Sequence, residues 1–295
     1  MKFPAPAKIN LYLKVTATLP DGYHELDTGF AYVDVADELT ISPADNLSVT
    51  CSNPHLNGEK NLVYRVLDAF RKQHGLSSGL SVHIDKQLPD RAGLGGGSSD
   101  AATALMVANR LWGVELSRQE LIRFATPFGA DIPCFLFARA SLAAGIGEQL
   151  SDYPGTLPAG FILLAYPGIG LSTPEVFSCY DRQTSAAAAL THNDATDTIR
   201  AHSGAAPGET AIGDNDLEAC ACTLSTEVDE LLKELRRASD MAWMSGSGSV
   251  SVALFEHRQE AEDTASMLLE GKLATWIHVG NLLSRHPLQD MNIGA

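Results

Sequence analysis

The stretch PDRAGLGGGSSDAA, residues 89–102, holds four glycines within five positions, and the rest of the chain is best interpreted outward from it. Without side chains, glycines let backbone N–H groups approach phosphate oxygens closely. The residues before the stretch, LSVHIDKQL (80–88), are typical of a strand. The serines and alanines predict a helix that begins at Ser98 or Ser99 and turns its positive end toward the loop. Strand, glycine loop and helix together predict an anion site, and a flexible turn with a serine cap is the alternative.

The glycine loop departs from the two commonest nucleotide-binding patterns. No GKS or GKT follows it, which excludes a Walker loop, and the spacing GLGGGSS does not fit GxGxxG. A second loop of glycines and serines, residues 245–249, lies between two predicted strands, where a tight hairpin is the alternative. These patterns favour a phosphate site that is neither a Walker loop nor a GxGxxG loop.

The first half of the chain predicts strands and helices in mixed order. Residues 9–15 alternate apolar and polar side chains, as a half-buried strand does, and residues 31–43 and 47–51 predict further strands of an antiparallel meander. Apolar residues recur at helical spacing from Asn61, and Gly75 predicts the end of that helix. A further helix is predicted over ELIRFATPF, which leads into GADIPCFLF and a short strand.

A stretch rich in glycine and proline, residues 151–160, predicts a lobe boundary. We therefore expect an N-terminal domain over residues 1–155 and a C-terminal domain over residues 156–295. Within the second lobe, Pro174 predicts a helix start, and the polar stretch 184–211 predicts a surface insertion. Helices then alternate with strands to residue 283, so the sequence predicts an α+β fold of antiparallel sheets with packed helices.

Composition narrows the classes of partner. The 36 acidic and 21 basic side chains give a formal charge of -15, which disfavours a nucleic-acid partner but leaves room for a small anionic ligand in one cleft. Five irregularly spaced cysteines indicate free thiols rather than a disulfide framework or a zinc site. The N-terminus lacks the apolar run of a signal peptide, and no stretch reaches membrane-spanning length. We expect a cytoplasmic protein without a membrane partner, and the sequence leaves its oligomeric state open.

Three segments in order resemble the motifs of the GHMP kinases: PAPAKINLYLKV (4–15), PDRAGLGGGSSDAA and MSGSGSVSVALF (244–255). Within that superfamily, the order of PAKINLYLKV, DGYHELDT, GLGGGSSDAA, GADIPCFL and NDLE resembles the members that phosphorylate the 2-hydroxyl of 4-diphosphocytidyl-2-C-methyl-D-erythritol. The resemblance implies an ATP- and Mg²⁺-dependent small-molecule kinase of non-mevalonate isoprenoid precursor synthesis. It also implies a two-lobed fold with the substrate cleft between the lobes.

The resemblance implies two catalytic residues. Asp131, in the segment GADIP, corresponds to the residue that accepts the proton of the substrate hydroxyl as the phosphoryl group transfers. Lys8, in the first motif, would keep Asp131 ionised and offset the charge that develops. An aspartate is a weak base toward an alcohol, but a loose transition state needs proton removal only late, so positioning matters more than basicity.

The resemblance also implies binding residues. Tyr23 and Phe177 would stack on the cytosine, His24 would hydrogen-bond it, and Asn10 would bind near the transferred group. Ser99 is the candidate Mg²⁺ ligand, and the role of Asp100 stays open. Residues of the second glycine loop would close over the substrate: Ser245, Gly246, Ser247 and Gly248. The ATP phosphates would lie against Pro89, Asp90, Arg91, Ala92, Gly93, Leu94, Gly95, Gly96, Gly97, Ser98 and Ser99.

Three other functions compete with this interpretation. A homoserine, mevalonate or sugar kinase would share the same loop, but the aromatic and histidine residues near position 24 favour a cytidine group. A catalytically silent nucleotide-binding protein would not need both Lys8 and Asp131. An RNA-binding module would show basic and aromatic surface residues, which the acidic composition disfavours.

Overall fold

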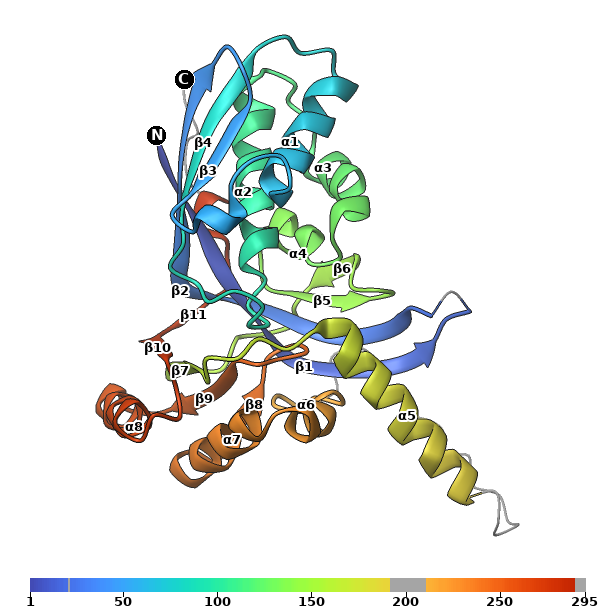
Figure 1. The fold of residues 1–295 in the computed structure, drawn as a ribbon, viewed down its shortest axis with the longest axis vertical. Coiled ribbons are helices and arrows are strands. Elements are labelled where there is room, and N and C mark those ends of the chain that lie inside the picture. The colour runs from blue at the N-terminus through green and yellow to red at the C-terminus, as the bar shows by residue number, and fades with distance from the viewer. Residues whose placement is uncertain (21, 192–210, 290–295) are drawn as a thin grey trace.

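A computed structural model describes residues 1–20, 22–191 and 211–289. Figure 1 shows two sheets with helices packed on each, so the predicted α+β class is confirmed. None of the helices in these residues is both long enough and apolar enough to span a bilayer.

The first sheet is built mainly from the N-terminal half of the chain. Its strand order is β3-β4-β2-β5-β6, and β1 and β11 also pair with β2. Its strands are β1 (Lys2–Thr18), β2 (His24–Ala44), β3 (Ser48–Cys51), β4 (Gly79–Asp85), β5 (Ser141–Ala144), β6 (Gln149–Asp152) and β11 (Leu282–Leu283). The prediction that residues 47–51 join an antiparallel meander is wrong, because β3 pairs with β4 in parallel. The chain between these strands crosses over through a helix, which returns it to the same end of the sheet.

Helices cover one side of the first sheet (Figure 1). They are η1 (Pro54–Leu56), α1 (Leu62–Gln73), α2 (Gly96–Leu111), α3 (Arg118–Ala125), η2 (Thr126–Phe128) and α4 (Ile132–Phe137). The side chain of Asn61 caps α1 by accepting a hydrogen bond from the Val63 N–H at 2.8 Å, and Gly75 follows the helix with a positive φ of 63°. Helix α2 begins at Gly96, two or three residues before the predicted start, because the glycines themselves adopt helical geometry.

The second sheet is antiparallel throughout, in the order β10-β7-β9-β8. Its strands are β7 (Phe161–Tyr166), β8 (Ala242–Met244), β9 (Ser251–Phe255) and β10 (Trp276–Gly280). The helices of this half are α5 (Thr173–Thr191), α6 (Glu218–Leu224), α7 (Thr226–Ala238) and α8 (Arg258–Glu270). Figure 1 shows α5 extending away from both sheets. The predicted surface insertion 184–211 is therefore helical as far as Thr191, and its residues 192–210 lie outside the described part of the chain.

The C-terminal part of the chain returns to the first sheet. Strand β11 pairs with β2, and η3 (Pro287–Gln289) contacts β1. The division of the chain at residue 155 stays a prediction, and β11 and η3 are elements of the second half that lie with the first sheet.

One apolar cluster joins the two sheets. Ile9 and Leu11 of β1 are buried in it together with residues of β7 and β9, among them Ile162, Leu164 and Val252. The indole N–H of Trp243 on β8 also donates to the backbone oxygen of Asn10 at 2.8 Å. Strand β1 of the first sheet is thus packed against the second sheet, and it carries two of the predicted site residues, Lys8 and Asn10.

A buried histidine near the C-terminus makes stability depend on pH. The Nδ1 atom of His286 accepts a hydrogen bond from the Leu288 N–H at 3.1 Å, and Nε2 has no hydrogen-bond partner among the described residues. Burial lowers the pKa of His286 to about 3. Below the ordinary histidine pKa of about 6.5, the unfolded chain therefore binds a proton that the folded chain does not, and stability falls as the pH drops from there toward 3.

Replacing His286 with asparagine should remove this dependence, because the amide oxygen can still accept from Leu288 but does not titrate. Between pH 6.5 and pH 5, the free energy of unfolding of the parent should fall by about 2 kcal/mol relative to H286N. Urea unfolding at both pH values measures the difference. Equal losses in parent and variant would show that His286 is not the titrating group.

Candidate active site

A cleft of about 1000 Å³ lies where β1, β2, the glycine loop, α5 and the loop between β8 and β9 meet. Nearly all the predicted site residues line it: Lys8, Asn10, Tyr23, His24, residues 89–98, Asp131, Phe177, Gly246, Ser247 and Gly248. Ser99 and Ser245 do not line the cleft, because both are fully buried beneath its wall. Residues more than 230 positions apart in the chain are therefore brought to one cleft.

Lys8 and Asp131 form an ion pair inside this cleft. The Lys8 Nζ atom lies 3.7 Å from Asp131 Oδ2, and it donates a hydrogen bond to Asn10 Oδ1 at 2.8 Å. The Lys8 side chain is only 4% exposed and lies over the ring of Phe30, whereas the Asp131 side chain is 41% exposed. Asp131 stands at the N-cap of α4 without a side-chain capping bond, so its carboxylate stays available to a bound molecule.

The glycine loop is held by backbone contacts on both sides. The Lys8 N–H donates to the Leu94 oxygen, and the Val250 N–H donates to the Ala92 oxygen, both at 3.0 Å. Gly93 has a φ of 80°, and a Cβ atom there would lie 2.4 Å from the backbone oxygen of Ser245. The loop conformation is thus fixed by its neighbours, which disfavours the alternative of a flexible turn.

The start of α2 presents unpaired backbone donors to the cleft. Gly95 occupies the N-cap in a left-handed conformation and supplies no side-chain capping bond. Gly96, Gly97 and Ser98, the first residues of this 16-residue helix, all line the cleft. The free N–H groups and the positive end of the helix dipole make this a site for an anion.

Ser99 does not fit the predicted role of a metal ligand. Its hydroxyl donates to the backbone oxygen of Pro6 at 2.7 Å and is fully buried against β1. The first turn of a helix points successive side chains in different directions, so Ser98, one residue earlier, is the serine on the cleft.

Asp100, whose role the sequence left open, belongs to a buried group of three charges. The Lys86 Nζ atom donates to Asp100 Oδ2 at 2.9 Å and also bonds Asp37 Oδ2. Asp37 Oδ1 in turn accepts from the N–H groups of Gln87 and Leu88. Burial raises the pKa of Asp100 to about 7 although Lys86 opposes the rise. Burial alone would lower the pKa of Lys86, but the two carboxylates outweigh it and raise that pKa. This group ties β2, the end of β4 and α2 together beneath the loop.

The three residues expected to hold the cytosine meet at the aromatic end of the cleft, and that Tyr23 and Phe177 stack on the base stays a prediction. His24, at the start of β2, stacks directly on Phe177 of α5 with ring centroids 4.5 Å apart and an angle of 22° between the planes. Its Nε2 atom pairs with Asp181 Oδ1 at 2.7 Å. Tyr23 is 61% exposed, so its ring lies largely in solvent at the edge of the same cleft.

The second glycine loop is joined to the first. The Ser245 hydroxyl accepts from the Asn10 N–H and donates to the Gly93 oxygen, both at 3.2 Å. The Asn215 side chain donates to the oxygens of Met244 and Gly246, both at 2.8 Å. Ser245 is therefore a buried link between the loops rather than a residue of the cleft surface. Asn215 begins the segment NDLE, which sequence reasoning noted only as part of the resemblance.

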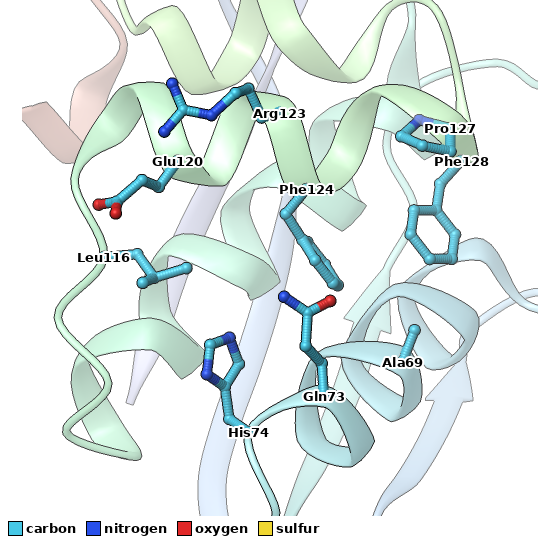
Figure 2. A pocket seen from close by; sticks show the side chains of 9 residues that line it. All are labelled: Ala69, Gln73, His74, Leu116, Glu120, Arg123, Phe124, Pro127 and Phe128. Carbon is cyan, nitrogen blue, oxygen red and sulfur yellow. The ribbon is translucent and has the colours of Figure 1, made fainter.

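A second pocket lies between α1 and α3 (Figure 2) and has a volume of about 570 Å³. It is lined by Ala69, Gln73, His74, Leu116, Glu120, Arg123, Phe124, Pro127 and Phe128. None of these is a predicted site residue, so the anion-binding helix end and the lysine–aspartate pair belong to the larger cleft alone.

Comparison with known proteins gives a consistent match. Residues 61–139 match the family model "GHMP kinases N terminal domain", and residues 187–271 match "GHMP kinases C terminal". A 4-diphosphocytidyl-2-C-methyl-D-erythritol kinase of Cupriavidus metallidurans is 39% identical over 97% of this chain and 94% of its own length. A protein of the same name from Prosthecochloris aestuarii is 39% identical over 90% of this chain and 92% of its own length.

Solved structures extend the comparison. A crystal structure of 4-(cytidine 5'-diphospho)-2C-methyl-D-erythritol kinase superposes with a TM-score of 0.75 at 33% identity, covering 96% of this chain and 99% of that one. A homoserine kinase from Cytophaga hutchinsonii superposes with a TM-score of 0.66 at 16% identity, covering 97% and 95% of the two chains. At that identity the second likeness shows a shared fold alone.

Proposed function

The chain belongs to the 4-diphosphocytidyl-2-C-methyl-D-erythritol kinases of the GHMP kinase family, and from that premise we propose how its cleft transfers a phosphoryl group. It is an ATP-dependent kinase. Its substrate is 4-diphosphocytidyl-2-C-methyl-D-erythritol, phosphorylated on the 2-hydroxyl in non-mevalonate isoprenoid precursor synthesis, and the products are the 2-phosphate and ADP. The observation that carries the mechanism is the buried Lys8 ammonium 3.7 Å from the half-exposed carboxylate of Asp131.

The ATP phosphates would lie against the glycine loop and the first turn of α2. The N–H groups of Gly96, Gly97 and Ser98 are free of side-chain caps there, and they line the cleft. Backbone donors at a helix start stabilise negative charge without the conformational cost of ordering long side chains. The loop therefore serves to hold the triphosphate in place, and the chemistry occurs where it meets Lys8.

Asp131 would accept the proton of the substrate hydroxyl. The hydroxyl oxygen forms a bond to the γ-phosphorus, the bond from that phosphorus to the bridging oxygen breaks, and ADP leaves. The proton moves to the carboxylate late in this step, so a weak base suffices if it is well placed. Lys8 would offset the negative charge that spreads over the transferring group, and its bond to Asn10 holds the ammonium in position.

The cleft fits a magnesium ion that is held mainly by substrate. No cluster of three metal-binding side chains occurs in residues 1–20, 22–191 and 211–289. Mg²⁺ commonly keeps several waters and takes one or two carboxylates together with phosphate oxygens. The Ser98 hydroxyl, on the cleft surface, is the group that would hold it, and the ion would supply charge neutralisation of the phosphates.

The substrate can be tested directly by a coupled ADP-release assay. With ATP and Mg²⁺, we expect turnover of 4-diphosphocytidyl-2-C-methyl-D-erythritol and at most ~1% of that rate with homoserine or mevalonate, because neither fills the aromatic end of the cleft. Product analysis should place the new phosphate on the 2-hydroxyl. Preference for homoserine or mevalonate would leave the kinase fold standing and refute the substrate.

A further inference from the structure

One carboxylate at the aromatic end of the cleft has no part in the mechanism above. Asp181 lies on α5, one helical turn after Phe177, and lines the cleft. Its Oδ1 atom is 2.7 Å from Nε2 of His24, whose side chain is only 6% exposed. The His24 ring is held on its face by Phe177 and meets Tyr180 edge-on at 6.4 Å. Stacking fixes the plane of the ring, and the bond to Asp181 fixes its rotation.

The bond to Asp181 also decides which nitrogen of His24 carries the hydrogen. An ionised carboxylate can only accept hydrogen bonds, so Nε2 carries a hydrogen, and in the neutral imidazole it is the only ring nitrogen that does. Nδ1 is then left with a lone pair and can only accept. No described residue forms a hydrogen bond with Nδ1, which leaves this acceptor free for a molecule in the cleft.

We propose that Asp181 is a positioning residue that fixes the tautomer of His24 and so makes the cleft select a base that donates a hydrogen bond over one that accepts. The inference rests on the proposed function. Cytosine carries a 4-amino group, a donor, where uracil carries a carbonyl oxygen, an acceptor. When Nδ1 is an acceptor, the amino group of cytosine can donate a hydrogen bond to it. The carbonyl oxygen of uracil cannot, because its lone pairs would face the lone pair of Nδ1. A polar site rejects the mismatched group because its own acceptor loses its partner.

The chain offers a matched control. His278 and Asp34 form a pair with the same atoms, Nε2 and Oδ1, at 2.8 Å. Neither residue lines the cleft. A substitution of Asp34 therefore disturbs the same kind of bond without touching base recognition.

The experiment compares the cytidine substrate with its uridine analogue, which differs only in the base. The variants are Asp181→Asn, Asp181→Glu and the control Asp34→Asn, all assayed at pH 8. Asparagine is close to aspartate in size, but its NH₂ can donate to Nε2 and so permit the other tautomer. D181N should lower the cytidine-to-uridine ratio of kcat/KM by about tenfold or more, mainly through KM. D181E, which keeps a pure acceptor, should retain more of the ratio than D181N, and D34N should retain all of it.

A second measurement reports the tautomer of His24 independently of enzyme activity. In ¹⁵N-histidine spectra, with the His24 signal assigned through His24→Gln, the parent should show the Nε2–H form and D181N should gain the Nδ1–H form. An unchanged ratio in D181N, or an Nδ1–H parent, overturns the inference. If the parent phosphorylates neither substrate, the proposed function fails instead, and base selection fails with it whichever tautomer the spectra show.

Discussion

Replacing Asp131 with alanine or asparagine is expected to lower kcat by about 10³-fold, with little change in the affinity for ATP. The carboxylate is the group beside Lys8 that can take the hydroxyl proton, and it lines the cleft without a capping role in α4. Its removal should therefore affect the transition state rather than the fold. Single-turnover kinetics with the cytidine substrate measures the chemical step, and titration with ATP measures the binding.

The control for Asp131 is Asp214, another carboxylate that pairs with a lysine of β1. Lys14 of β1 forms an ion pair with Asp214 at 3.5 Å, and neither residue lines the cleft. Asp214→Asn should leave kcat within about threefold of the parent, because an exposed ion pair contributes little. A D131N enzyme with more than a tenth of the parental kcat would rule out proton transfer to Asp131 as part of the mechanism.

The second large effect is expected at Gly93. Alanine there would place its Cβ 2.4 Å from the Ser245 backbone oxygen and would force a side chain into a φ of 80°. The Ser245 oxygen cannot move freely, because the N–H of the same residue donates a hydrogen bond to the Val250 backbone oxygen at 3.0 Å. We expect G93A to lose about 2–4 kcal/mol of unfolding free energy and to bind ATP poorly.

The matched control is an alanine substitution at Gly97, four residues further along the chain. A Cβ atom at Gly97 would meet nothing within 4 Å, and this residue already lies in α2. Alanine in a helix is favoured over glycine by up to about 1 kcal/mol, so G97A should be as stable as the parent or slightly more stable. Urea unfolding of both variants makes the comparison, and equal stability of G93A and G97A would contradict the close contact at Gly93.

Local sequence features predicted local structure well. Asn61 and Gly75 mark the two ends of α1 because a side-chain cap and a left-handed glycine act within a few residues. The glycine loop was recognisable because so many glycines in one place are costly without a function. The fold followed from three motifs whose order is specific even though each motif alone is weak, and the substrate followed from the order of five segments.

Features that depend on distant contacts could not be predicted in the same way. Ser98 and Ser99 are adjacent, and only the packing of α2 against Pro6 decides which hydroxyl reaches the cleft. The role of Asp100 stayed open, because its partner Lys86 lies 14 positions earlier and Asp37, which Lys86 also contacts, lies on β2. The pairing of His24 with Asp181 spans 157 positions and has no local signal.

Strand β1 belongs to the first sheet and packs against the second, and this has a consequence for how the molecule unfolds. Ile9 and Leu11 pack against the second sheet, and the Leu13 N–H donates to the Asp214 oxygen at 2.8 Å, while the strand also pairs with β2 over most of its length. Proteolytic cleavage between residues 153 and 160, after the end of β6, would therefore not release two autonomous halves. The chain should melt in one cooperative transition, and a fragment ending at residue 155 would expose the apolar side of β1 and tend to aggregate.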